Sequence, residues 1–160
     1  MLIFDIETNG LHQHLKQLHC VVLWDSESSC LHPYRPDELY SGLRQLKERK
    51  VIAGHNIIGF DLPALFKLYG EWDHVPNVVD TLVLSRFLWP ERPWGHSLKG
   101  WGKHLGIEKI DFEYTEENFA EFSEEMLAYC IQDVLLNAEV FKALEAEYGH
   151  SLSEGYNIYN

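Results

Sequence analysis

The feature that most constrains this chain is its apolar N-terminal stretch, LIFDIET, at residues 2–8. Its β-branched and aromatic residues are typical of a strand in the core of a domain. Two acids, Asp5 and Glu7, interrupt this stretch. A carboxylate in a core strand costs several kcal/mol unless something compensates it. Alternate residues of a strand share one face, so we expect both acids to point the same way and to need a partner there.

Length and composition favour one compact domain. The chain has 160 residues, of which 46% are hydrophobic and 13% aromatic, which suits a proper core and argues against disorder. No apolar run approaches the length of a membrane-spanning helix, and the N-terminus lacks the basic region and cleavage site of a signal peptide. We therefore expect a cytoplasmic protein without a membrane partner.

The three cysteines, Cys20, Cys30 and Cys130, are far apart in the sequence. They form no CxxC pair, and their number is odd. We expect them to be small core residues in a reducing compartment rather than a disulfide or a zinc set.

The formal net charge of −12 limits how this chain can bind nucleic acid. Affinity for the phosphate backbone depends on Lys and Arg, so an acidic protein of this size should bind long DNA weakly by itself. Solubility is the simpler explanation of the total charge. It is compatible with a second one, in which metal ions neutralise some of the carboxylates, and the position of each acid decides between them.

The pattern of apolar residues and turn residues predicts the order of elements. Strands are expected at residues 2–7, 19–25, 51–56 and 78–80, with an edge strand at 30–35 because Pro33 disfavours a central place. Helices are expected at 36–50, 61–70, 81–88 after an Asp80 N-cap, 97–106, and 123–148 with Ser123 as N-cap and Met126, Cys130, Val134, Phe141 and Leu144 toward the core. This order predicts an α/β domain, a central mixed β-sheet flanked by α-helices, over residues 1–150, followed by a C-terminal tail at 151–160.

Three further polar residues are expected near the two strand acids. Asp61 follows the strand at 51–56 and begins a helix, while Tyr129 and Asp133 are four apart on one helix face. Convergent carboxylates would repel one another, and Mg²⁺ or Mn²⁺ with oxygen ligands would remove the repulsion. Two such ions about 3.5–4 Å apart can activate a water and stabilise a leaving oxygen in phosphoryl transfer.

Each of these motifs has a plainer explanation when it is taken alone. A DxE motif on a strand often means a surface-facing or edge segment, and Asp61 by itself fits a helix N-cap. A Tyr and an Asp four apart are usually one core residue and one solvated residue. All three explanations would have to hold together while reproducing the order of a known set of motifs.

That order resembles the DnaQ-like, or DEDD, family of 3′-5′ exonucleases, which has a ribonuclease H-like fold. FDIETNGL (4–11) resembles the first motif of the family, HNIIGFDLPAL (55–65) the second, and YCIQD (129–133) the third, whose tyrosine marks the DEDDy subgroup. VVDTLVLSR (78–86) and GHSLKGWGKHLG (95–106) are similar to the proofreading exonuclease domain of family A DNA polymerases from short-tailed bacteriophages. The resemblance covers residues 1–148.

The resemblance implies a role for each acid and for the tyrosine. Asp5, Glu7, Asp61 and Asp133 would bind two Mg²⁺ or Mn²⁺ ions. Asp5 would bridge both ions, Glu7 and Asp133 would complete the site of the ion that holds the attacking water, and Asp61 would serve the other ion, partly through water. Tyr129 would orient that water, because an ordinary pKa of about 10 makes a tyrosine a poor base at neutral pH.

The resemblance also implies substrate contacts near the first two motifs. Thr8 would lie near the 3′-terminal nucleotide, Leu11 would be an apolar wedge against the last bases, and Asn56 would help to position the substrate loop. The alternative is that residues 8–10 form a turn and that Leu11 caps the core.

A basic and aromatic patch at residues 89–106 could hold a single strand through phosphate contacts and base stacking. The candidate contacts are Trp94, His96 and Lys99. In the alternative, Trp101 belongs to the core and the charged residues are only solvated. The basic residues of the patch are Arg92, His96, Lys99, Lys103 and His104, and its indoles are Trp89, Trp94 and Trp101.

Three functional hypotheses follow. The first is a metal-dependent 3′-5′ exonuclease that hydrolyses single-stranded DNA from its 3′ end to nucleoside 5′-monophosphates, in proofreading, replication or DNA degradation. The second is an exoribonuclease or oligoribonuclease with the same site. The third is a non-catalytic module of a replication complex, although no acid of the motifs is lost. The resemblance implies a DNA polymerase or another replication protein as partner, and the host cytoplasm if the chain is viral. With no length for a polymerase, we expect a stand-alone enzyme, a separate proofreading subunit or an excised domain.

Overall fold

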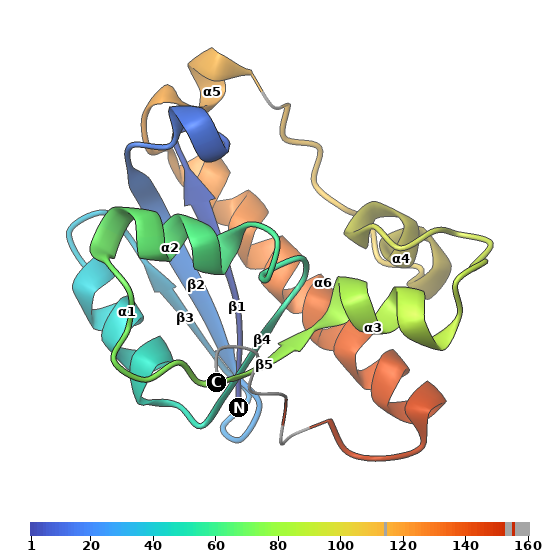
Figure 1. Cartoon of the computed structure of the whole chain (residues 1–160). Helices are drawn as coiled ribbons and strands as arrows, with labels where there is room; N and C mark the ends of the chain where they lie inside the picture. Colours follow the sequence, from blue (N-terminus) through green and yellow to red (C-terminus); the bar gives the residue numbers. More distant parts are fainter. Residues whose placement is uncertain (114, 153–154, 156–160) are drawn as a thin grey trace.

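The computed structural model describes residues 1–113, 115–152 and 155 (Figure 1). They form one five-stranded sheet in the order β3-β2-β1-β4-β5. β1 pairs with β2 and β2 with β3 in antiparallel fashion, whereas β1–β4 and β4–β5 are parallel, so the sheet is mixed as predicted. The strands are β1 (Leu2–Thr8), β2 (Leu18–Asp25), β3 (Cys30–Tyr34), β4 (Val51–Gly54) and β5 (Asn77–Asp80).

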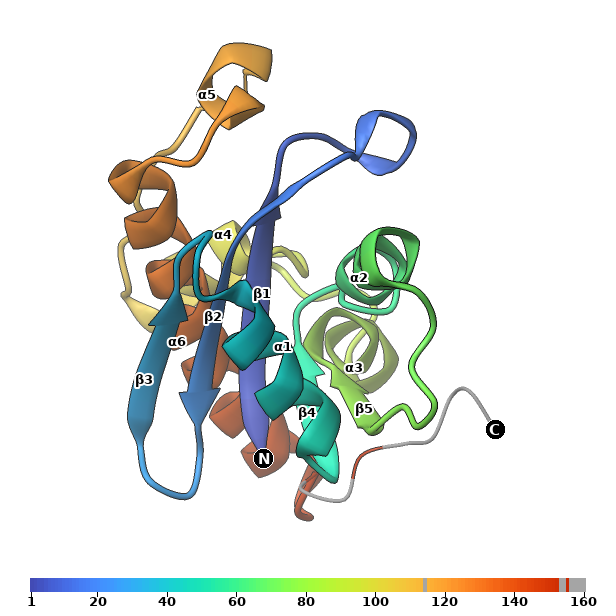
Figure 2. The ribbon, with the colours of Figure 1, turned by 90° about the vertical axis from the view of Figure 1, so that its left-hand side faces the viewer.

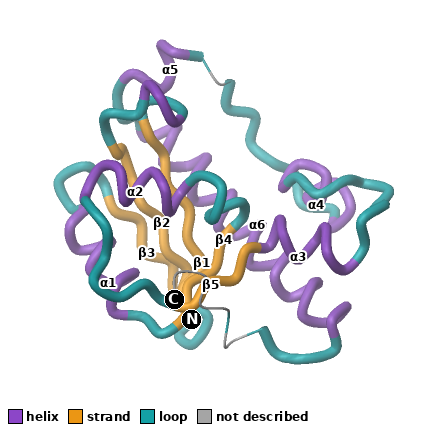
Figure 3. Tube along the Cα trace, in the orientation of Figure 1, coloured by secondary structure: helices purple, strands orange, loops and turns teal. Residues whose placement is uncertain are grey.

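Helices cover both faces of this sheet (Figures 2 and 3). α1 and α2 pack against the face that carries Leu2, Phe4 and Ile6 of β1. α3, α4 and α6 pack against the opposite face, which carries Ile3. Because side chains alternate along a strand, Asp5 and Glu7 share the face of Ile3 and point toward α6. The helices are α1 (Leu39–Glu48), α2 (Asp61–Tyr69), α3 (Thr81–Leu88), α4 (Leu98–Leu105), α5 (Glu116–Ala120) and α6 (Glu124–Tyr148), with a short 3₁₀ turn, η1 (His12–His14).

Several local predictions are confirmed. β3, which contains Pro33, is an edge strand. The Ser123 hydroxyl caps α6 by accepting a hydrogen bond from Met126 N at 3.1 Å. Asp80 caps α3 through Leu82 N and Val83 N. The five residues predicted to face the core from the long helix are all buried.

Other boundaries differ from the predictions. β4 ends at Gly54 rather than at residue 56, because Asn56 has a φ of +64° and leaves the extended conformation. α1 begins at Leu39 rather than at residue 36, because Glu38 N donates to Arg35 O in a turn before the helix. The short α5 was not predicted.

One cysteine prediction is wrong, because Cys30 is exposed on the edge strand. Cys20 and Cys130 are buried as expected. In the predicted tail, Leu152 packs into the core, and residues 153–154 and 156–160 lie outside the described part. The boundary at residue 150 stays a prediction. None of the described helices combines the length and the apolar character needed to cross a membrane.

Candidate active site

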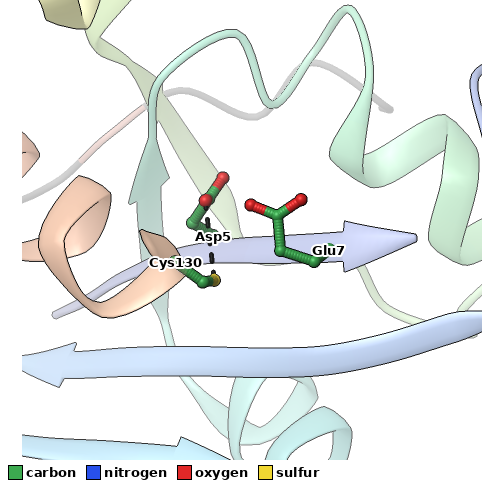
Figure 4. Close-up of side chains that lie close together, drawn as sticks. All are labelled: Asp5, Glu7 and Cys130. Carbon is green, nitrogen blue, oxygen red and sulfur yellow. Dashed lines mark hydrogen bonds between the residues drawn. The ribbon is translucent and has the colours of Figure 1, made fainter. Parts of the chain in front are cut away.

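The two strand acids lie together on the α6 side of β1. Their carboxylates project from the same side of the strand, and Cys130 of α6 approaches Asp5 (Figure 4). One ligand atom from each of Asp5, Glu7 and Cys130 lies within 4.8 Å of the other two. Burial and the nearby Asp133 charge raise the pKa of Asp5 to about 7. Burial and Asp5 hold the pKa of Glu7 well above its usual range.

Asp61 is the first residue of α2 and is only 3% exposed. The N-cap of this helix is Phe60, so the N-cap explanation of Asp61 is wrong. Burial and the Asp5 charge raise the pKa of Asp61. The loop before α2 is held by Asp80, which accepts hydrogen bonds at 3.0 Å from both Asn56 N and Ile58 N.

On α6, Tyr129 and Asp133 share one face, as their spacing predicts, and one cation contacts both. Lys109 Nζ is 2.9 Å from Asp133 Oδ2 and donates a 3.0 Å hydrogen bond to the Tyr129 hydroxyl. Burial opposes the charge of Lys109, but Asp133 and Tyr129 outweigh burial and raise the pKa of the lysine. Burial and Asp133 raise the pKa of Tyr129 as well. Sequence reasoning missed Lys109, which lies in an irregular loop where no periodic pattern marks it.

His55, a second missed residue, anchors the loop of the second motif. Its Nδ1 is 2.9 Å from the Thr81 hydroxyl, which also donates to Asn137 Oδ1 of α6 at 2.7 Å. Burial and the nearby Lys109 charge lower the pKa of His55 to about 4, so the ring is neutral at pH 7. This chain of contacts ties the residue after β4 to α3 and α6.

The four carboxylates fit divalent cations. Asp5, Asp133 and Asp61 each raise the pKa of Glu7, so the acids are close enough to repel one another. Within the described part of the chain, Asp61 Oδ1 and Asp133 Oδ1 are buried without a hydrogen-bond partner. Buried carboxylate oxygens are rarely left unpaired, and hard cations such as Mg²⁺ bind oxygen ligands of this kind. Lys109 forms an ion pair with only one of the four acids.

The residues predicted to contact substrate near the first two motifs differ in exposure. The Thr8 hydroxyl donates to Gly10 O at 2.9 Å and is buried, so it takes part in the turn that was the alternative. Leu11 is 53% exposed and does not cap the core. Asn56 is exposed. Their substrate roles stay predictions.

The aromatic patch is largely packed against itself. Trp94 stacks on His104 with a centroid distance of 3.4 Å, and Trp101 is buried in the core. Arg92 lies 4.6 Å from the Trp101 ring centroid, and its Nη2 contacts Glu147 at 3.0 Å, so this charge stabilises the fold.

The remaining members of the patch differ in what they contact. His96 makes hydrogen bonds to the Ser85 hydroxyl and to Pro90 O. Lys99 and Lys103 are exposed, and together with Lys109 they line a cavity of about 540 Å³.

Comparison with known proteins identifies the family. A family profile described as 3′-5′ exonuclease matches residues 1–148. The chain belongs to this 3′-5′ exonuclease family. No protein of curated function matches the sequence.

Solved structures of nucleases share the fold, which is ribonuclease H-like as predicted. Brucella melitensis NrnC bound to pGG has a TM-score of 0.69 and 22% identity, over 92% of this chain and 72% of that one. Escherichia coli RNase D has a TM-score of 0.64 and 19% identity, over 92% of this chain and 39% of that one. Exonuclease X in complex with 5′ overhanging duplex DNA has a TM-score of 0.60 and 15% identity, over 96% and 95%.

Proposed function

We propose that this chain is a metal-dependent 3′-5′ exonuclease of the DEDDy type that hydrolyses single-stranded DNA to nucleoside 5′-monophosphates. The observation that carries the proposal is the group of four mutually repelling carboxylates from β1, α2 and α6, two of which have buried oxygens without a partner in the described structure. Such a group has little stability unless cations neutralise it. Membership of the exonuclease family supports the same reaction.

In this proposal, Asp5, Glu7, Asp61 and Asp133 hold two Mg²⁺ or Mn²⁺ ions. When bound, such ions lower the pKa of a coordinated water and stabilise the negative charge on the leaving oxygen. The chain supplies their ligands at positions that the sheet and the two helices define. Tyr129 stays protonated at neutral pH because its pKa is raised, so its hydroxyl orients the attacking water rather than acting as a base.

Lys109 positions the helix side of the site. Its ammonium donates to the Tyr129 hydroxyl and pairs with Asp133, so both side chains are held before substrate arrives. Fixing catalytic groups in advance lowers the cost of reaching the reactive geometry. Thr8, Leu11 and Asn56 are proposed to lie along the terminal nucleotides, and Trp94, His96 and Lys99 along the strand that leads to them.

The test is a gel assay with 5′-labelled single-stranded DNA, in Mg²⁺, Mn²⁺ or EDTA. The wild type should shorten the strand from its 3′ end, and EDTA or Asp5→Ala should abolish the shortening. Asp73→Ala removes an exposed acid outside the three motifs, and it should behave as wild type. Release of 5′-labelled mononucleotide as the first product would contradict the proposed polarity.

A second candidate is an exoribonuclease, because the fold is shared with RNase D, which is described as an exoribonuclease involved in structured RNA processing. The same carboxylates serve both reactions, and the sugar is read by contacts to the 2′-hydroxyl. An RNA oligomer of identical sequence, run beside the DNA, separates the two. Faster shortening of the RNA would favour the second candidate.

For the DNA activity we propose a role in replication, with a DNA polymerase or another replication protein as the partner. An acidic chain should hold DNA weakly, and attachment to a polymerase or another replication protein would raise its effective concentration at a 3′ end. A cytoplasmic location, or the host cytoplasm for a viral chain, accords with this role. Processive digestion by the isolated chain would argue against the need for a partner. Tight binding of nucleic acid without turnover would indicate a non-catalytic module instead.

A further inference from the structure

Cys130 places a sulfur atom among the carboxylates of the proposed site, and the hydrolytic scheme gives it no role. It lies in α6 three residues before Asp133, and its Sγ is 3.6 Å from Asp5 Oδ2. Asp5 and Glu7 project from β1 on the same side, and the thiol reaches Asp5 from the helix (Figure 4). Three potential ligand atoms, two oxygens and one sulfur, therefore converge.

The spacing of these atoms fits a tetrahedral ion. Zn²⁺ binds thiolate sulfur at about 2.3 Å and carboxylate oxygen at about 2.0–2.2 Å, which places two such ligands about 3.5–3.7 Å apart at a tetrahedral angle. The Sγ–Oδ2 separation of 3.6 Å lies in that range without any movement of the chain. One Glu7 carboxylate oxygen lies within 4.8 Å of Sγ and of one Asp5 carboxylate oxygen, so the three residues are near enough to share one ion after a shift of the Glu7 side chain.

A second observation points to a cation at the same place. Asp61 is 3% exposed, and its Oδ1 has no hydrogen-bond partner among the described residues. It lies close enough to Asp5 for the two charges to repel each other. Asp133 is less available to a new ion, because Lys109 is paired with its Oδ2. Asp5, Glu7 and Asp61 therefore form no ion pair with a described residue and are available to bind a cation, and Cys130 lies beside Asp5.

We propose that Asp5, Glu7 and Cys130 bind a thiophilic divalent cation, Zn²⁺ or Co²⁺, in competition with the hard ions that use Asp5 and Glu7. Mg²⁺ takes oxygen ligands and gains little from sulfur, whereas Zn²⁺ and Co²⁺ bind thiolate well. Binding forms a bond from Cys130 Sγ to the ion, breaks the S–H bond and releases one proton to solvent. Zinc should therefore inhibit the reaction in Mg²⁺. This consequence rests on the proposed function, but the binding itself does not.

The experiment is a titration of the metal-free full chain with Co²⁺ alone, followed by near-ultraviolet absorption. A thiolate-to-Co²⁺ charge-transfer band should grow to one ion per chain in the wild type. Cys130→Ser should lose the band. It should also weaken Co²⁺ binding, measured by calorimetry, by more than the roughly 10- to 100-fold that is lost when a residue hydrogen-bonded to a metal ligand is removed. Circular dichroism would verify that the variant is folded.

Cys30→Ser is the matched control, because Cys30 is exposed on β3 and is not part of the cluster. It should keep the band unchanged. A wild type that binds Co²⁺ without the band, or a Cys130→Ser variant that retains it, would overturn the inference. Activity in Mg²⁺ is measured separately. An active enzyme without the band would refute only the thiophilic site, and an inactive protein with the band would refute only the proposed exonuclease.

Discussion

The acids on β1 and the acid on α6 are surrounded by charge in different ways. Asp5 and Glu7 make no ion pair with any described residue. Burial raises the pKa of both, and so do neighbouring acids, Asp133 for Asp5 and Asp5 for Glu7. Asp133 is equally part of the acidic group, but Lys109 pairs with it at 2.9 Å. The strand side therefore depends on a cation from outside, whereas the helix side already carries one. In the proposed enzyme, bound metal ions neutralise Asp5 and Glu7 on β1, whereas Lys109 already neutralises Asp133 on α6.

Removing one charged group from the strand side and one from the helix side should lower the single-turnover rate by different amounts. Asp5→Asn removes the proposed bridging ligand and should lower the single-turnover rate by about a thousandfold. Lys109→Met should lower it by about tenfold, the scale of an outer partner, because Asp133 and Tyr129 remain present but are less well held. Lys109→Arg should restore part of the loss by supplying a cation again. Equal losses from Asp5→Asn and Lys109→Met would abolish the distinction between the two sides.

The strand side should also make the metal-free protein sensitive to pH. Asp5 has a pKa of about 7 in the folded chain against 3.8 unfolded, so the folded state binds more protons between those values. Stability in EDTA should fall as pH rises from about 4 through 7, and the raised pKa values of Glu7 and Asp61 act in the same direction. His55 has a pKa of about 4 in the folded chain against 6.5 unfolded, so by itself it makes stability rise with pH between those values. One such group opposes the fall in stability that the three acids cause.

Thermal unfolding in EDTA and in Mg²⁺, between pH 5 and pH 8, measures this effect. The melting temperature should drop by several degrees in EDTA, and Mg²⁺ should remove the drop because bound ions stabilise the ionised acids. Asp5→Asn should flatten the EDTA curve. A metal-free protein that is most stable at pH 8 would show that the strand acids are not under mutual repulsion.

Replacing Asp61 or Asp133 by the neutral asparagine should shift the melting temperature in opposite directions. Asp61→Asn removes a buried charge that has no ion pair among the described residues, so it should raise the melting temperature in EDTA. Asp133→Asn leaves Lys109 partly buried and without its counter-ion, so it should lower the melting temperature. Each change is about 1–3 kcal/mol, or a few degrees for a domain of this size. Exposed Asp73→Asn is the control, and shifts of the same sign at both sites would contradict the comparison.

The smallest effect is expected at the outer lysines. Lys99 is exposed and lines the same cavity as Lys109, but its contact with Asp111 is a loose 3.9 Å. Lys99→Ala should raise KM for a single strand by about two- to threefold and leave kcat unchanged, as expected for one exposed charge. Steady-state assays at two salt concentrations measure it. A larger effect on kcat than on KM would place Lys99 nearer the reaction than the structure does.

Local sequence patterns were enough for most of the fold and for part of the site. The two-residue period of β1 placed Asp5 and Glu7 on one face, and the four-residue spacing in α6 placed Tyr129 with Asp133. Pro33 marked an edge strand, and Ser123 marked the start of α6. These inferences succeed because they depend only on backbone geometry within a few residues. The prediction that Cys30 is a core residue failed, because burial depends on the place of the strand in the sheet and the edge strand leaves Cys30 exposed.

The contacts that decide the electrostatics of the site needed the tertiary structure. Lys109 meets Asp133 across 24 positions of sequence, and Cys130 meets Asp5 across 125. Arg92 resembles any charged residue of a basic patch in the sequence, yet it is buried against indole rings and paired with Glu147. The sequence by itself determined which elements form and which side chains share a face, because hydrogen bonding and periodicity act locally. Only the packing of α6 against β1, and of Lys109 against α6, decided which acids have a counter-ion, because charge–charge energies depend on distance in space and on burial.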